Sequence, residues 1–205
     1  TTNRQIALAR EDMQFFTWEH PYVSAAMDLV LSSETGNATI SVVRHNDLKP
    51  GQFLLECLFI VECSAPAELQ ISRFLPATPI RILIDQNMQD LSLAIEHRSL
   101  IANKMSFEQG QIVEFINNQR EHISKILSLA NQNAKTSMQT LIGDANKTML
   151  GSLTAEIKRL VRLKKVNPSI KADEIEYLKD MTMLAHEHIQ AAQIRLDAVR
   201  FLITS

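Results

Sequence analysis

The residues with the clearest chemical potential are histidines and carboxylates in the last quarter of the sequence. His186, Glu187 and His188 come close to the HExxH pattern of zinc proteases, in which two histidines one helical turn apart bind the metal. The position that needs the second histidine is occupied by Gln190, and His186 and His188 point about 200° apart on a helix. We therefore expect solvated helix residues here and no metal site.

A run of carboxylates from Asp173 to Glu176 superficially resembles the acidic box of helicases. That motif needs a preceding apolar strand, whereas this run follows a turn that contains Pro168. Acidic side chains in the first turn of a helix complement the positive end of the helix dipole. The sequence therefore favours a structural explanation for these carboxylates.

The segment from Trp18 to Pro21 places an indole, a carboxylate and an imidazole at a predicted helix start, where an anion could bind. Packing and helix capping are the favoured interpretation. The sequence contains no Gly-x-x-x-x-Gly-Lys phosphate loop. We predict no catalytic, cofactor-binding or metal-binding residue in this chain.

Cationic side chains near a predicted helix end form the one candidate binding site. No acidic residue interrupts their run, and three of them, spaced four and three apart, share one helix face. Cations at a helix carboxyl terminus also complement the dipole, so a solvated helix end is the competing explanation. We call this set the basic elbow: Lys158, Arg159, Arg162, Lys164, Lys165 and Lys171.

An apolar run from Phe53 to Cys63 predicts the central strand of a sheet, with both faces covered by other elements. Proline at position 21 and apolar spacings of three and four predict a helix over 21–32. Alternation predicts a strand over 39–45, which a turn at 48–51 would join to the central strand as a hairpin. Further strands are predicted over 67–74, 80–85 and 91–95.

Helical periodicity begins near Phe107 and continues to about residue 165, with Gly143 and Gly151 weakening it by about 1 kcal/mol each. Whether this segment is one helix or two stays open. Asn167 and Pro168 end it, and a second helix is predicted over 173–199, antiparallel to the first. The elbow between them should project into solvent. Alternation over 199–203 predicts a strand that returns to the sheet.

The fold class predicted from these elements is α+β, a mostly antiparallel sheet with flanking helices followed by a long antiparallel helical hairpin. We divide the chain into a sheet-containing half, residues 1–104, and a hairpin with its final strand, residues 105–205. We predict that both are parts of one C-terminal domain of a longer protein. Acidic residues outnumber basic ones in the first half and the reverse holds in the second.

Composition is that of an ordinary globular chain, with 205 residues, 45% apolar and 21% charged. Cys57 and Cys63 would lie roughly 20 Å apart on one strand, too far to pair, so we expect two buried free thiols. Buried thiols suit a reducing, cytoplasmic location. The sequence has no apolar run near the length of about 18 residues that a membrane helix needs, and no membrane partner is expected.

Eight segments, spread over essentially the whole chain, carry a resemblance to a known family. They are Ala7–Phe15, Trp18–Pro21, Ala26–Leu29, Gly36–Asn37, Val61–Cys63, Arg73–Pro79, Val166–Pro168 and Arg195–Arg200. In the same order, these segments resemble the C-terminal region of the RapA (HepA) family, the bacterial RNA polymerase-associated Swi/Snf ATPases.

The resemblance implies a bacterial, cytoplasmic parent protein that binds RNA polymerase and DNA and hydrolyses ATP, with Mg²⁺, to release stalled polymerase during transcription. Its motor lies upstream, and none of its catalytic residues has a counterpart here. The leading hypothesis is a non-catalytic accessory domain that packs on the motor domains or contacts polymerase. The alternative is a nucleic-acid-contacting module that uses the basic elbow at 158–171. Self-association of the fragment stays open.

Overall fold

The structure is a computed structural model that describes residues 4–10, 17, 20–32, 37–103, 109–167 and 169–205. It divides into two compact units, residues 1–37 and residues 38–205, and each unit is described separately. The predicted turn at 33–37 lies almost wholly outside the described residues, as does the predicted boundary between residues 104 and 105. The second unit contains the sheet and the helical hairpin together.

The described residues of the first unit form two helices, α1 (Arg4–Ala9) and α2 (Pro21–Ser32). The bounds of α2 confirm the predicted helix over 21–32. It begins at Pro21 because proline has its φ angle preset for the first turn and lacks the N–H that would have no intrahelical partner. The carbonyl of His20 accepts the first helical hydrogen bonds, from the N–H groups of Val23 and Ser24.

Five strands form the sheet of the second unit, in the order β3-β2-β5-β1-β4. Their bounds are β1 (Ala38–Arg44), β2 (Phe53–Glu62), β3 (Thr78–Asp85), β4 (Ile101–Asn103) and β5 (Gln193–Thr204). Only β1 and β5 are parallel, and the other three pairings are antiparallel. The predicted α+β class and mostly antiparallel sheet are therefore confirmed.

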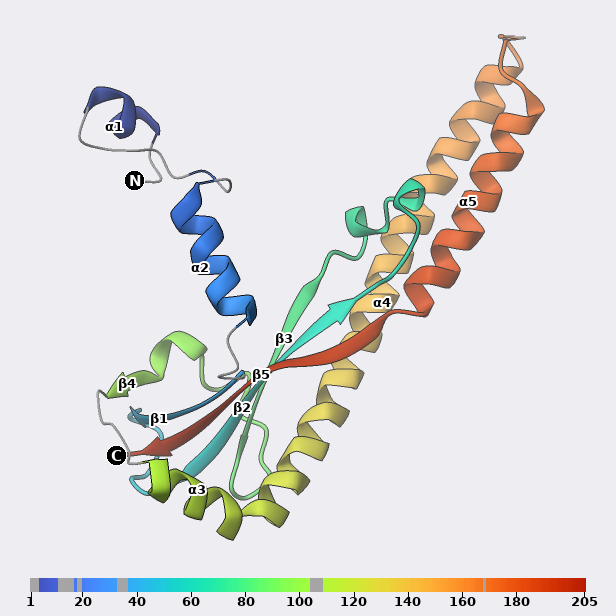
Figure 1. Ribbon diagram of the computed structural model, residues 1–205. Helices are drawn as coiled ribbons and strands as arrows, with labels where there is room; N and C mark the ends of the chain where they lie inside the picture. Colours follow the sequence, from blue (N-terminus) through green and yellow to red (C-terminus); the bar gives the residue numbers. More distant parts are fainter. Residues whose placement is uncertain (1–3, 11–16, 18–19, 33–36, 104–108, 168) are drawn as a thin grey trace. The chain divides into compact units, whose positions relative to one another are not determined.

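The predicted hairpin between β1 and β2 is wrong, because β5 lies between these two strands (Figure 1). The turn at 48–51 passes across the end of β5 and holds it there. The Thr204 hydroxyl donates a hydrogen bond to the Lys49 carbonyl and accepts one from the Gln52 N–H at 2.8 Å. The Gly51 N–H donates to the Thr204 carbonyl, also at 2.8 Å.

The predicted strand over 67–74 is also wrong, since this segment forms two short 3-10 helices, η1 (Ala67–Leu69) and η2 (Ile71–Arg73). They meet at Gln70, whose φ of 49° is left-handed and breaks any extended path. Residues 91–95 form a turn instead of the predicted strand. The predicted strand over 80–85 is confirmed as β3, which tolerates Pro79 because it lies at the sheet edge.

The helical part contains α3 (Gln109–Asn118), α4 (Arg120–Lys164) and α5 (Ala172–Gln190). Helix α4 runs without interruption for 45 residues, so Gly143 and Gly151 do not divide it. It pairs with α5 in the predicted hairpin. The predicted helix over 173–199 is too long, because α5 ends at Gln190 and β5 already begins at Gln193.

Two apolar clusters cover the two faces of the sheet. On one face the larger cluster joins alternate residues of β2, such as Leu55 and Phe59, to Ile126 of α4 and Ile189 of α5. On the other face the smaller cluster includes Leu54 and Leu202, and it is covered by the segment 91–100, which contains the short 3-10 helix η3 (His97–Ser99). Both faces of β2 are therefore covered, as predicted, and among the described residues the α-helices pack on the first face.

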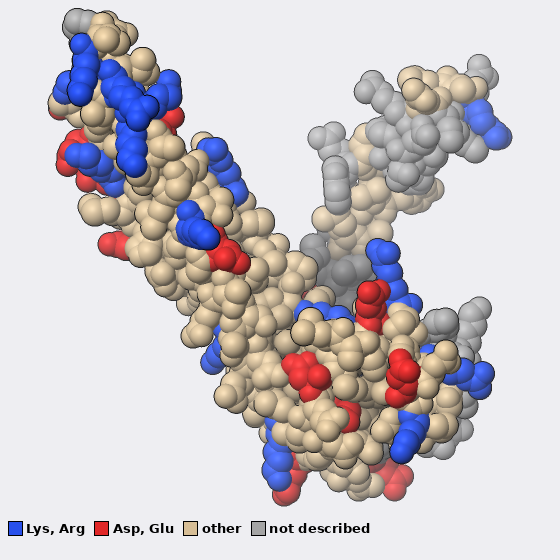
Figure 2. Space-filling model, turned by 180° about the vertical axis from the view of Figure 1, so that it is seen from behind, with Lys and Arg blue, Asp and Glu red and all other residues tan. Residues whose placement is uncertain are grey.

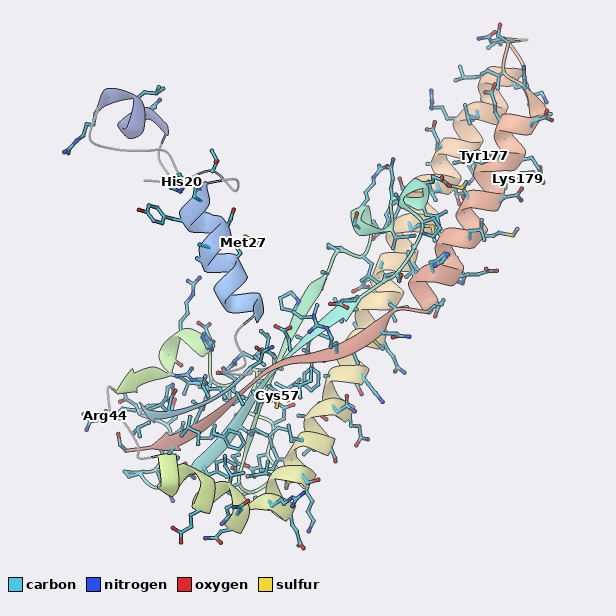
Figure 3. The ribbon with its side chains drawn as sticks, viewed as in Figure 1. His20, Met27, Arg44, Cys57, Tyr177 and Lys179 are labelled. Atoms are coloured by element: carbon cyan, nitrogen blue, oxygen red, sulfur yellow. The ribbon has the colours of Figure 1, made fainter. Side chains whose placement is uncertain are left out.

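The two cysteines are free, as predicted, but only Cys57 is fully buried (Figure 3). Burial, with the nearby Glu56 carboxylate, raises the pKa of the Cys57 thiol to about 12. Cys63 is half-buried, and its thiol donates to the carbonyl of His188 at 3.1 Å. Burial raises the pKa of Cys63 as well.

Candidate interaction surface on the helical hairpin

The hairpin of α4 and α5 extends beyond the sheet within the second unit (Figure 1). At 1.5 Å per residue, the 45 residues of α4 span roughly 65 Å. Its first half packs on the sheet through buried residues such as Ile126 and Ala130. Its second half runs beside α5 to the turn at 165–171, which we call the free end of the hairpin.

Local hydrogen bonds end α4 and begin α5 at this turn. The N–H groups of Val166 and Asn167 donate to the carbonyl of Leu163, and the Asn167 side-chain oxygen accepts from the Ser169 N–H at 3.0 Å. Asp173 and Glu174 lie in the first turn of α5. This position confirms that the acidic run complements the helix dipole.

All six side chains of the basic elbow are exposed. Arg159 binds the carboxylate of Glu156, one turn earlier, at 2.6 Å and 3.0 Å, and this hydrogen bond raises the pKa of Arg159. Within the described part of the chain, the other five cations have no carboxylate within ion-pair distance. The expected shortage of acidic partners therefore holds for all of them except Arg159.

Continuous helix through this region places Lys158, Arg162 and Lys165 on one side of α4, as their spacing predicts. Lys164 points to the opposite side, and Lys171 precedes α5 as its N-cap. The basic elbow is thus distributed around the free end. Figure 2 shows Lys and Arg side chains gathered near this end of the hairpin, with acidic side chains beside them.

A shallow depression of about 390 Å³ lies on α4 within this region. Its lining residues recur at steps of three and four, so they form one side of the helix. We call this set the outer stripe: Ala155, Lys158, Arg159, Arg162 and Leu163.

The histidines near the end of α5 are half-buried and each has a partner in another element, so they are less solvated than expected, whereas Glu187 between them is exposed. His186 Nδ1 lies 2.9 Å from the side-chain oxygen of the buried Asn146 on α4. His188 Nδ1 lies 3.0 Å from the carbonyl of Ser64, beyond the end of β2. Among the described residues, no group of three or more His, Cys, Asp or Glu side chains could hold a metal ion.

At the start of α2, His20 accepts a hydrogen bond at Nδ1 from the Tyr22 N–H and stacks on the Tyr22 ring at 5.4 Å between centroids. These contacts confirm the capping interpretation for His20. Trp18 and Glu19 lie outside the described residues.

The sequence analysis missed a buried ionic cluster around Glu56, which is only 6% exposed on the second face of the sheet. Its carboxylate accepts from Arg81 Nε and lies 2.9 Å from His97 Nδ1 and 3.4 Å from Arg200 Nη1. A glutamate between apolar neighbours in a buried strand was the available signal. The cluster ties β2 to β3, β5 and η3.

Burial on its own raises the pKa of Glu56, because it disfavours the charged carboxylate. Hydrogen bonds from His97 and Arg81, and the positive charge of Arg81, outweigh this effect and hold the pKa below its usual value. Glu56 is therefore ionised at neutral pH and serves as the counter-ion of two arginines.

In the described part of the chain, none of the helices combines the length and the apolar character that crossing a bilayer requires. A comparison with protein families matches residues 1–204 to the family described as RNA polymerase recycling family C-terminal. This match covers the sheet, the hairpin and the first unit together, and it agrees with the resemblance found in the sequence. The chain therefore belongs to the RNA polymerase recycling family, as a C-terminal domain of that family.

Proposed function

We propose that this domain is a non-catalytic accessory domain of an RNA polymerase-associated Swi/Snf-type ATPase, and that its hairpin contacts polymerase or the motor domains of the same protein. Membership of the RNA polymerase recycling family supports the connection to polymerase. The observation that carries the proposal is the long hairpin, whose free end presents exposed cations away from the sheet. An element of this length positions a binding surface far from the core that supports it.

In this proposal ATP and Mg²⁺ bind to the motor, in the cytoplasm, and this chain binds neither. The absence of a Gly-x-x-x-x-Gly-Lys phosphate loop from this sequence supports this assignment. Equilibrium dialysis of the chain against labelled ATP should therefore show no saturation at micromolar concentration. Saturable binding that a substitution in this chain abolishes would contradict the proposal.

A second candidate function is contact with nucleic acid. Lys158, Arg162 and Lys165 lie on one side of α4 and have no carboxylate within ion-pair distance among the described residues. Each phosphate that a cation neutralises contributes about −0.9 to the slope of log affinity against log salt for duplex DNA. Salt dependence therefore separates the two candidates.

The experiment compares binding of the chain to core RNA polymerase and to duplex DNA across a salt series. A variant with Lys158, Arg162 and Lys165 changed to Ala should weaken polymerase binding with little change in stability, because exposed charges contribute little to folding. If DNA is the partner, the same variant should lose DNA affinity, with a slope shallower by about 3.

The matched control changes Lys125, Lys135 and Lys147, which are exposed on α4 outside the basic elbow, to Ala. It removes the same charge and should bind polymerase as the wild type does. Failure of the unmodified chain to bind either core polymerase or the motor domains of its parent protein would refute the leading proposal.

A further inference from the structure

The outer stripe combines apolar and cationic side chains in a way that a solvated helix does not require. Ala155 and Leu163 supply the apolar part of the depression, and Lys158, Arg159 and Arg162 surround them. All five residues are exposed, and Leu163 keeps 36% of its surface in water. Apolar side chains next to arginine are a combination that protein interfaces use at their centre.

Most of the outer stripe faces away from the residues that hold the hairpin together. Leu153, Ile157 and Leu160 are half-buried and lie about 140° to 180° around α4 from Ala155 and Arg162. That opposite side is the one available to α5. Leu163 lies at the edge of the outer stripe, about 60° from Leu160, and keeps 36% of its surface exposed.

The charges of the outer stripe indicate which kind of partner would bind there. Lys158 and Arg162 have no carboxylate within ion-pair distance among the described residues, whereas Arg159 is paired with Glu156. Two cations without partners beside an apolar floor complement an apolar side chain flanked by carboxylates.

We propose that the outer stripe binds an acidic segment of a partner protein. The segment inserts an apolar side chain between Ala155 and Leu163 and places carboxylates against Lys158 and Arg162. This inference rests on the proposed function, in which the hairpin contacts a protein surface, and it specifies the chemistry of that contact.

Nucleic acid fits the outer stripe less well. Most contacts to nucleic acid go from cations and polar groups to phosphate, and these leave Ala155 and Leu163 without an apolar partner. Single-stranded nucleic acid would use aromatic side chains for base stacking, and none lines the depression. Protein interfaces, in contrast, combine arginine with apolar residues at their centre.

The test uses the chain with core RNA polymerase and duplex DNA as separate probes. Ala155→Gln fills the apolar floor without changing charge, and Gln keeps a good helix propensity. A double variant, Lys158→Gln with Arg162→Gln, removes the charges and keeps the floor. Lys147→Gln is the matched control, because it removes one exposed charge of α4 outside the basic elbow.

We expect Ala155→Gln to lower the affinity for polymerase about tenfold at every salt concentration, as loss of a central contact does. The double variant should lower it by a similar factor at low salt, with a flatter salt dependence. Lys147→Gln should stay within about twofold of wild type. Circular dichroism and thermal unfolding of each variant establish that the hairpin is intact.

Wild-type affinity of both Ala155→Gln and the double variant for polymerase would overturn this inference and leave the proposed function standing. Loss of DNA binding in the double variant, with polymerase binding unchanged, would assign the outer stripe to nucleic acid and also overturn it. If the unmodified chain does not bind polymerase, this inference is overturned, and the proposed function is refuted as well if the motor domains do not bind the chain either.

Discussion

Replacing Leu202 with Ala tests whether β5 holds the sheet together. Leu202 has no exposed surface, and it lies opposite Leu54 on β2 and Ser41 on β1. It belongs to the cluster on the second face of the sheet, together with Val43 and Leu83. The substitution removes three carbon atoms from the middle of this cluster without changing any backbone hydrogen bond.

The expected loss of stability has two contributions, the lost transfer free energy of the removed carbon atoms and the cavity that they leave. Three buried carbon atoms at about 0.8 kcal/mol each account for about 2.4 kcal/mol of transfer free energy. The cavity adds to this, because the sheet and the segment 91–100 cannot both collapse into the space, and buried Leu→Ala changes cost about 2–5 kcal/mol. We expect Leu202→Ala to lower the free energy of unfolding by about 3–5 kcal/mol.

Urea denaturation followed by circular dichroism measures this loss, with Leu93→Ala as the matched control. Leu93 is fully exposed, so its truncation should change the free energy of unfolding by less than about 0.5 kcal/mol. Deletion of residues 200–205 removes the pairing of β5 with β1 and should prevent folding of the sheet. A loss below about 1 kcal/mol for Leu202→Ala, or an unchanged melting temperature after the deletion, would refute the central position of β5.

Glu56→Gln should destabilise the domain by about 3 kcal/mol at pH 7, because it leaves two half-buried arginines without their counter-ion. The pKa of Glu56 in the folded state is lowered from 4.5, so the difference in free energy of unfolding between wild type and Glu56→Gln should shrink as pH falls below 4.5. Urea titrations that give the same difference at every pH would argue against this role of Glu56. Gly143→Ala should raise the free energy of unfolding by about 0.4–1 kcal/mol, because its added methyl meets no atom within 4 Å. Gly51→Ala should lower the free energy of unfolding, because φ is 79° at that position. Thermal unfolding of both variants checks that the two changes have opposite signs. A bulky thiol reagent should label Cys63 before Cys57, whose raised pKa and burial protect it, and mass spectrometry of the native protein would reveal the reverse order.

The elements that the sequence predicts well are those with a long, locally consistent pattern. The apolar run of β2, the proline at the start of α2 and the periodicity of α4 each depend on neighbours in sequence. The continuity of α4 through Gly143 follows from tertiary packing, since about 1 kcal/mol of lost propensity is small beside the burial of the flanking Ile142 and Ala145.

The errors arose where long-range pairing decides the structure. Spacings of three and four continue through Ala192, Leu196 and Val199, so the predicted helix ran past Gln190, although backbone pairing with β1 and β2 makes this segment a strand. The same pairing excludes the predicted hairpin of β1 and β2. No local pattern encodes which strand enters between two others.

For the candidate site, spacing alone predicted the shared side of Lys158, Arg162 and Lys165, because helical geometry requires it. The ion pair of Arg159 with Glu156 could be identified only from the side-chain positions in the structure. The structural contacts of His186 and the ionic cluster around Glu56 both join residues far apart in sequence, and so neither could be read from a motif. The binding role of the basic elbow stays a prediction.

The insertion of β5 between β1 and β2 has a consequence for the order in which the domain acquires its structure on the ribosome. The pairing of β2 with β3 and that of α4 with α5 involve nearby residues and can form early. The two halves of the sheet stay separate until residues 193–204 have emerged, since β1 and β2 have no direct pairing. During that interval each half presents an unpaired apolar strand edge, which chaperones must protect from pairing with other nascent chains.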